Sequence, residues 1–339
     1  MTGRSVRVVV DAMGADRGPE EIVAGAKQAE SRAIRPLIVG PSGLDTHGLE
    51  LIEARDVIEM DEKPTESVRA KPDSSLVVAC RAVGEGRADA VVSPGNTGAM
   101  LAASLLHIRR LKGVLRPAIA VVLPARLGPN VLIDAGANAD ARAEQLLQFA
   151  HMGTVLSGDV LGVRKPRVRL LSIGEEAEKG NQLTLEAHEL MAAEAGLDFG
   201  GNTEGRDILS GGDEVIVTDG FTGNVALKLL EGTIGTILEA LRREIEATPR
   251  GKLGGLLIRP AARRLRTRLD PDTYGGAYLL GLRGLAVIAH GNSSARAIAN
   301  AVRLAARGVD HDVVGRLERR LQGEDEVLES APSTTPTPE

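Results

Sequence analysis

The segment Ala90-Val91-Val92-Ser93-Pro94-Gly95-Asn96-Thr97-Gly98-Ala99 carries the pattern from which the architecture follows. A short β-branched run over 89–93 passes through a turn bearing Gly and Asn into a segment over 97–109 with apolar residues at helical spacing. This change of period predicts a strand followed by a helix. Because open α/β sheets bind ligands beyond the carboxyl ends of their strands, we expect this turn to line a site.

The same arrangement recurs along the chain. Four other apolar runs end in polar, glycine-bearing turns at 8–14, 131–138, 170–181 and 213–224. Strands are predicted over 6–10, 36–39, 89–93, 117–123, 130–134, 167–173 and 213–218, and helices over 19–32, 74–86, 97–109, 141–156 and 182–195. The alternation predicts an α/β fold with a largely parallel sheet, and we expect the five turns to converge on one site.

Composition restricts the class of protein. The 339 residues carry a net charge of −5 and only three Phe and two Tyr, so we expect no nucleic acid as partner. Cys80 is the only cysteine, which fits a reducing cytosol. We find no signal peptide and no apolar run long enough to span a membrane, and predict a cytoplasmic protein that meets membranes only at its surface. One domain over 1–325 and a disordered tail over 326–339 are expected.

Familiar catalytic motifs are missing from the sequence. It has no Gly-x-Gly-x-x-Gly, no P-loop, no Gly-x-Ser-x-Gly, no His-Glu-x-x-His and no paired cysteines. We therefore predict no cofactor, no metal and no covalent nucleophile. The polar turns instead suit a reaction in which a bound anion attacks.

Two turns offer donors for such an anion. Asn96 and Thr97 open the helix after strand 89–93, where free N–H groups and the helix dipole suit phosphate. Asp219 to Asn224 open another helix, where Thr222 and Asn224 can donate to a carbonyl oxygen as in an oxyanion hole. The alternative for both turns is ordinary helix capping, and each turn alone leaves the two interpretations even.

Other polar residues form weaker candidates. Lys179, in a glycine-flanked polar loop, is either a solvated partner of nearby glutamates or a cation for phosphate or a leaving thiolate. A lone histidine at the position of His290 is more often a structural residue than a general acid in catalysis. A second group of cationic and hydroxyl donors, with surface and cap roles as the alternative, comprises Arg69, Lys71, Ser74 and Ser75.

A basic amphipathic insertion is predicted over 249–270. Its seven basic residues have no acid among them over 250–269, and leucines recur at helical spacing on both sides of Pro260, which predicts a pair of helices rather than one rod. The surface suits anionic lipid or an acidic protein, and a solvated helix facing a subunit neighbour remains the alternative. The residues assigned to this membrane or carrier-protein surface are Leu253, Leu256, Leu257, Arg263 and Arg264.

Taken together, the motifs resemble a known family. From about Val6 to Leu304 the chain is similar to the acyl-acyl carrier protein:phosphate acyltransferases of bacterial phospholipid synthesis, the PlsX family. The shared motifs are Asp11-Ala12-Met13-Gly14, Ser74-Ser75, Gly95 to Ala99, Gly136-Ala137-Asn138, Gln148-Phe149-Ala150 with Met152-Gly153, Gly174-Glu175-Glu176 with Lys179-Gly180-Asn181, Glu204 to Asp207, Asp219 to Asn224 and Gly275 to Gly281.

The resemblance implies a three-layer α/β/α fold with a large, mixed, mainly parallel sheet, as in the isocitrate dehydrogenase and phosphotransacetylase group. It implies a homodimer that transfers a fatty acyl group from acyl carrier protein to inorganic phosphate, beside an anionic membrane that holds an acyltransferase using acyl phosphate. Lys179 and Asn224 are then the chief catalytic contacts. Substrate binding falls to Asp11, Arg69, Lys71, Ser74, Ser75, Asn96, Thr97, Asn138, Asp219, Thr222 and His290.

Two other functions stay open at this point. A short-chain phosphotransacylase using coenzyme A shares the chemistry but does not need the basic insertion. A non-catalytic membrane scaffold would use the insertion but leaves the polar turns unexplained.

Overall fold

One 11-stranded sheet organises the protein, which a computed structural model describes over residues 4–269, 273 and 275–322. The strand order is β3-β2-β1-β4-β11-β10-β5-β6-β9-β7-β8. The strands are β1 Val6–Asp11, β2 Ile34–Gly40, β3 Glu50–Glu53, β4 Ala90–Ser93, β5 Ala118–Leu123, β6 Asn130–Ile133, β7 Arg167–Ser172, β8 Asp198–Glu204, β9 Val215–Val217, β10 Ala277–Leu280 and β11 Leu285–Ile288.

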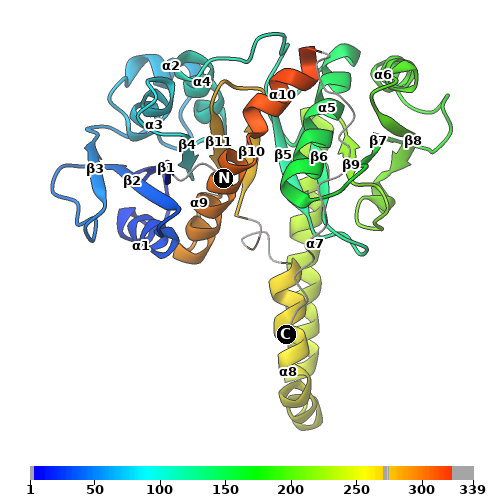
Figure 1. The fold of residues 1–339 in the computed structure, drawn as a ribbon. Helices are drawn as coiled ribbons and strands as arrows, with labels where there is room; N and C mark the ends of the chain where they lie inside the picture. The colour runs from blue at the N-terminus through cyan, green and yellow to red at the C-terminus, as the bar shows by residue number, and fades with distance from the viewer. Residues whose placement is uncertain (1–3, 270–272, 274, 323–339) are drawn as a thin grey trace.

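Helices cover both faces of this sheet (Figure 1). They are α1 Pro19–Ala29, α2 Pro64–Ala70, α3 Ser75–Gly84, α4 Thr97–His107, α5 Ala143–Leu161, α6 Gln182–Ala193, α7 Gly220–Glu246, α8 Pro249–Leu269, α9 Ala295–Asp310 and α10 Val313–Gln322, with a 3₁₀ turn at Gly205–Asp207. Successive strand residues point to opposite faces, so Val8 and Val10 join the core under α1, α5, α6, α9 and α10, and Val9 joins the core under α2, α3, α4 and α7. The predicted three-layer α/β/α fold is confirmed.

All seven predicted strands are present, and four were missed. β3 and β8 lie at the two edges of the sheet, where one face and one side are exposed and apolar alternation is not required. β10 and β11 lie in the centre, within a Gly-rich apolar run whose short strands give no period. The sequence pattern therefore failed to predict strands in which glycine or charged residues take the place of β-branched residues.

The direction of the strands reverses across the centre of the sheet. β11 pairs antiparallel with β10, β10 with β5, and β5 with β6, whereas every other pairing is parallel. After three reversals, β6, β9, β7 and β8 run opposite to β3, β2, β1, β4 and β11. The turns after β4 and β6 thus follow strands that run in opposite directions, so any convergence of the five turns does not come from a shared strand direction.

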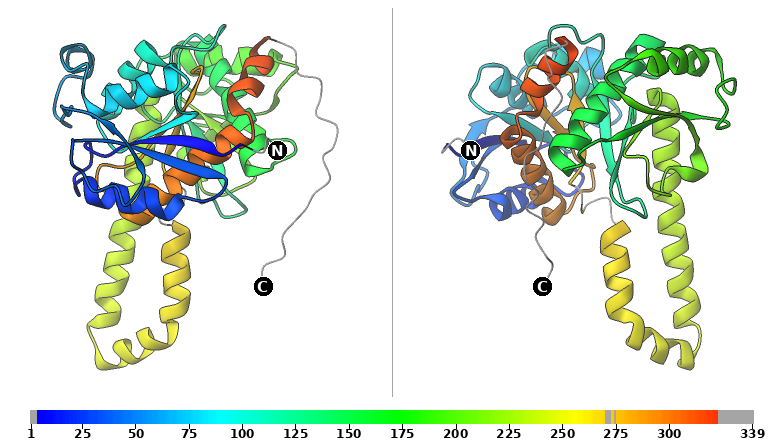
Figure 2. Two further views of the ribbon diagram at one scale, coloured as in Figure 1. Left: turned by 60° about the vertical axis from the view of Figure 1, so that its left-hand side comes forward. Right: turned by 45° about the vertical axis from the view of Figure 1, so that its right-hand side comes forward.

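A helical hairpin made by α7 and α8 projects from the layered body (Figures 1 and 2). α8 continues through Pro260 as one helix, but it is bent, with a first part across the tip of the hairpin and a second part that returns beside α7 (Figure 2), so the predicted two segments are joined, and it buries none of its side chains. Proline removes the hydrogen bond to the carbonyl of Leu256. Because the helix is exposed, water can satisfy that carbonyl, so the helix need not end there.

None of the helices in the described ranges combines the length and apolar content needed to cross a membrane. The tail predicted over 326–339 lies outside the described residues.

Candidate functional site

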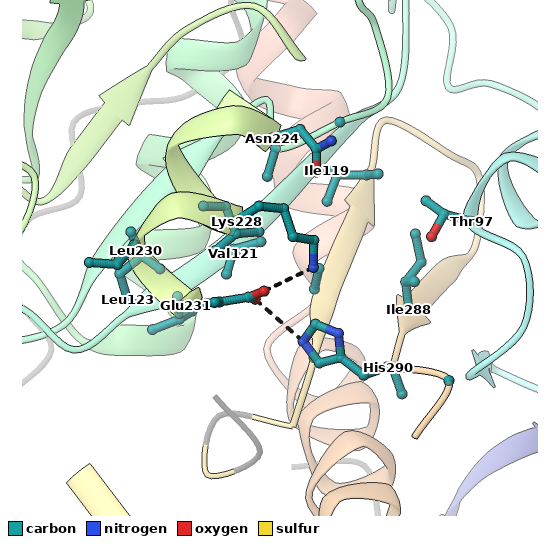
Figure 3. Close-up of a pocket in the computed structure, with 18 of the residues that line it drawn as sticks. Thr97, Ile119, Val121, Leu123, Asn224, Lys228, Leu230, Glu231, Ile288 and His290 are labelled. Carbon is teal, nitrogen blue, oxygen red and sulfur yellow. Dashed lines mark hydrogen bonds and ion pairs between the residues drawn. The ribbon is translucent and has the colours of Figure 1, made fainter. Parts of the chain in front are cut away.

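A cavity of 410 Å³ lies on the sheet face that packs against α4 and α7 (Figure 3). Its floor is apolar: Ile119, Val121 and Leu123 alternate along β5 and so share one face. Val121 pairs with Ala277 of β10, which in turn pairs with Ile288 of β11. The floor thus spans the three strands where the sheet reverses.

Turns from both halves of the sheet form the cavity walls. Gly95, Thr97 and Gly98 come from the turn after β4, while Ala135 and Gly136 follow β6. Three of the five polar turns, counting that of Asn224 on α7, therefore reach one cavity although they follow strands that run in opposite directions. The central antiparallel strands bring them together.

Buried side chains on the side away from the cavity stabilise the turn before α4. Ser93 Oγ donates to Asp11 Oδ2 at 2.7 Å and accepts from the Gly95 N–H at 3.1 Å. An ideal Cβ on Gly14 would lie 2.8 Å from Gly95 Cα, so the first polar turn packs directly on the second. Asp11 is fully buried and therefore shapes the cavity wall without facing the cavity.

The side chain of Asn96 also has a structural role. Its Oδ1 caps α4 by accepting from the Ala99 N–H at 3.0 Å, and its Nδ2 donates to the carbonyls of Glu59, Met60 and Glu62 at 3.1 to 3.3 Å. The cap satisfies the third amide of the helix. The first two amides of an α-helix have no intrahelical acceptor, so the Thr97 and Gly98 N–H groups stay available to an anion at the cavity.

A buried carboxylate shapes the opposite wall. Asp134 accepts backbone hydrogen bonds from Ile119, Gly136, Ala137 and Asn138, and one from Asn138 Nδ2, at 2.8 to 3.1 Å. Burial raises the pKa of Asp134, and these donated bonds oppose that shift. Asn138 Nδ2 also donates to the Pro117 carbonyl at 2.8 Å, so this side chain holds the turn and lies behind the wall.

The first residues of α7 include a pair of side chains that cap the helix and a third side chain that is free to donate a hydrogen bond. Asp219 accepts from the Thr222 N–H at 2.9 Å and from Thr222 Oγ1 at 2.7 Å, so the two side chains satisfy each other. Asn224 lies on the cavity side of the helix (Figure 3), and within the described ranges its amide makes no hydrogen bond. It can therefore donate to a bound carbonyl oxygen.

Three charged or titratable side chains meet at the cavity. Lys228 Nζ lies 2.9 Å from one oxygen of Glu231, and His290 Nε2 lies 3.6 Å from the other (Figure 3). Asn224, Lys228 and Glu231 are spaced i, i+4 and i+7, which puts them on one face of α7. Sequence reasoning missed Lys228 and Glu231, although this spacing from Asn224 was the signal that points to them.

The remaining predicted site residues lie elsewhere. Lys179 is exposed in the loop after β7, where its carbonyl accepts from Ser172 Oγ at 2.9 Å, and it does not line the cavity. Lys71 Nζ donates to Glu62 at 2.5 Å and to the Val57 carbonyl at 2.8 Å. The cavity thus brings together Thr97, Asn224 and His290, with Asp11, Asn96 and Asn138 behind its walls, and leaves outside it Arg69, Lys71, Ser74, Ser75, Lys179, Asp219 and Thr222.

Comparison with known proteins shows which family this chain belongs to. The model of a family described as "Fatty acid synthesis protein" matches residues 6–316. "Phosphate acyltransferase" of Heliobacterium modesticaldum is 46% identical over 94% of this chain and 98% of its own length. The chain belongs to the phosphate acyltransferase family. A second member, from Picosynechococcus, is 42% identical over 99% of this chain and 96% of its own length. Membership of the phosphate acyltransferases makes this protein an acyltransferase.

Solved structures share the fold of this phosphate acyltransferase family member. A phosphotransacetylase from Streptococcus pyogenes has a TM-score of 0.60 at 19% identity, covering 91% of this chain and 95% of its own. A branched-chain phosphotransacylase from Enterococcus faecalis has a TM-score of 0.60 at 15% identity, covering 90% and 99%. At such identity the likeness shows the layered architecture alone.

Proposed function

We propose that this protein transfers a fatty acyl group from acyl carrier protein to inorganic phosphate and releases acyl phosphate for phospholipid synthesis. The observation that carries the proposal is the single cavity that joins the free amides of Thr97 and Gly98, the donor Asn224 and an apolar floor. The polar groups suit the reacting anion and carbonyl, and the floor suits the alkyl part of the donor.

The chemistry needs little from the protein beyond placement. A phosphate oxygen forms a bond to the thioester carbon, the tetrahedral intermediate collapses, and the carbon–sulfur bond breaks to release a thiolate. A thiol of pKa about 8.5 is a good leaving group, so no enzyme nucleophile is required. Holding the reactants in line and donating to the oxyanion supply the rate enhancement. Asn224 is the proposed oxyanion donor.

Lys179 is kept as a second catalytic proposal on the strength of the motif Lys179-Gly180-Asn181. It follows β7, two strands from β6 in the half of the sheet that supplies Asn224. Its ammonium group would hold phosphate or the departing thiolate. The cavity geometry supports Asn224 more directly, because Asn224 lines the cavity and Lys179 does not.

Thiol release tests the proposed reaction. Purified protein is mixed with acyl-acyl carrier protein and phosphate, and new thiol is measured with a chromogenic reagent. Cys80 is fully buried and burial raises the pKa of its thiol to about 12, so it adds little background. We expect release only with phosphate present. Release without phosphate, or only from coenzyme A thioesters, would overturn the proposal in favour of a hydrolase or a short-chain phosphotransacylase.

Two surfaces support the proposed partners. Exposed Leu253, Leu256 and Leu257 lie among the basic residues of α8, which suits an anionic membrane where acyl phosphate is used next. Exposed apolar side chains also occur along α7, and a second copy of the chain in a homodimer would cover them. They are Phe221, Val225, Leu229, Ile237 and Leu241, a row that winds around the helix because four residues exceed one turn. Light scattering is expected to give twice the monomer mass.

A further inference from the structure

We propose that Lys228 is the cation that holds phosphate in the cavity, in line with the amide groups at the start of α4. This inference rests on the proposed function and deepens it, because it names the residue and the place where the attacking anion binds. Neither the sequence motifs nor the matched relatives assign a role to Lys228.

Charge balance in the cavity is the first support. Phosphate carries between one and two negative charges near neutral pH, and bringing it into a partly apolar cavity is costly without a paired cation. Among the described residues that line the cavity, Lys228 is the only lysine or arginine, and Glu231 is the only carboxylate. The amides of Thr97 and Gly98 can share the anion but supply only partial charge.

The position of Lys228 is the second support. Its side chain extends from α7 into the cavity, with Thr97 across from it and Asn224 one helical turn away on its own helix (Figure 3). Lys228, the start of α4 and Asn224 therefore border the same space, so phosphate bound at Lys228 can face a carbonyl oxygen held by Asn224. Attack on a thioester carbon requires the two reactants to be held side by side in this way.

The ion pair with Glu231 does not prevent this role. The Lys228 side chain is 56% exposed and that of Glu231 23%, so water reaches the pair and weakens it. Glu231 also has His290 at 3.6 Å from its other oxygen, so its carboxylate keeps a neighbour when Lys228 turns to phosphate. In the free protein, the pair keeps the ammonium group at the cavity rather than swinging in solvent.

Steady-state kinetics test the proposal. In Lys228→Ala we expect the KM for phosphate to rise by about tenfold or more, the usual effect of losing a hydrogen bond to a charged group. The KM for acyl-acyl carrier protein should change little, because the acyl donor does not depend on this cation. Lys228→Met, which keeps the length of the side chain, should behave in the same way.

A matched control removes a similar pair elsewhere. Lys27 Nζ lies 2.7 Å from Glu30 at the same i, i+3 spacing, at the end of α1 and away from the cavity. Lys27→Ala is expected to leave the KM for phosphate unchanged. If Lys228→Ala behaves like Lys27→Ala in a phosphate-dependent enzyme, Lys228 is only a surface partner of Glu231 and the proposal is overturned.

Binding without turnover separates this inference from the proposed function. Inorganic phosphate should raise the Tm of the wild-type protein and of Lys27→Ala, but not that of Lys228→Ala. Absence of turnover in wild type, with this Tm pattern intact, would overturn the proposed reaction and leave Lys228 as an anion site. An equal phosphate-dependent rise in Tm for Lys228→Ala would overturn the Lys228 site itself.

Discussion

Buried polar side chains build the walls of the cavity, and exposed ones face its interior. Asp11, Asn96 and Asn138 each make hydrogen bonds that fix a turn, whereas Asn224 and Lys228 stay free enough to meet a ligand. A buried polar group must be satisfied inside the protein, so it cannot also serve a substrate without cost. Substitutions of the first set should therefore act on folding, and those of the second set on turnover.

The oxyanion role of Asn224 makes a prediction about rate. Asn224→Ala should lower kcat by about a hundredfold or more, as loss of an oxyanion donor does elsewhere, while Tm stays near that of the wild type. Lys179→Ala should give a comparable loss if its loop serves the substrate as the motif implies. A wild-type rate in either variant would remove that residue from the reaction.

Glu62 makes a prediction about pH. The backbone N–H of Glu59 and the ammonium group of Lys71, together with Ser67, lower the pKa of Glu62 to about 2. A lowered folded-state pKa stabilises the protein fully above the ordinary value of 4.5, and that stability is lost as pH falls toward 2. The stability difference between wild type and Glu62→Gln should thus shrink between pH 5 and pH 2.

Urea unfolding at a series of pH values measures that difference. Glu50→Gln, which removes a carboxylate from the exposed Arg35–Glu50 pair at the edge of the sheet, is the control for the same chemical change at a surface ion pair. A constant difference between wild type and Glu62→Gln across this range would contradict the assigned pKa.

At the scale of elements, α7 depends on close approach to the turn after β6. An ideal Cβ on Gly223 would lie 1.9 Å from the Asp134 carbonyl oxygen, so only glycine lets the helix start against that turn. Gly223→Ala should destabilise the protein by about 1–3 kcal/mol, the usual cost of forcing an extra methyl group into a packed site. It should also lower activity, because Asn224 follows directly.

Gly232 provides the opposite outcome on the same helix. Nothing lies within 4 Å of an ideal Cβ there, so Gly232→Ala should stabilise α7 by about 0.5–1 kcal/mol. Thermal unfolding of the two variants compares the same chemical change in two environments. Equal effects of the two substitutions would contradict the packing described for Gly223.

The projecting hairpin makes a prediction about membranes. Leu256 and Leu257 are 66% and 79% exposed on a basic helix, so Leu256→Glu with Leu257→Glu should abolish flotation with vesicles that contain anionic lipid. Leu106→Glu, at an exposed position of α4, should float like the wild type. Unchanged flotation of the double variant would exclude lipid as the partner of α8.

At the scale of the whole molecule, local sequence patterns predicted most elements but not their global direction. Turns such as 95–98 and 219–224 were visible because glycine and asparagine mark them whatever their surroundings. Two of the antiparallel pairings, β10 with β11 and β5 with β6, join consecutive strands, but the pairing of β10 with β5 joins strands far apart in sequence, and no local period reports it. Thr97, Asn224 and His290 were predicted from their motifs to share one site, whereas Lys228 and Glu231 at the same cavity were found only with the fold.

Phosphorus NMR on a complete reaction gives the most direct test of the central claim, that one cavity brings phosphate to an acyl thioester. Wild-type protein with acyl-acyl carrier protein and phosphate should produce a new acyl phosphate resonance in step with the thiol released. Asn224→Ala should produce it at least about a hundredfold more slowly. Thiol release with no acyl phosphate resonance, or equal product formation by wild type and Asn224→Ala, would contradict the account.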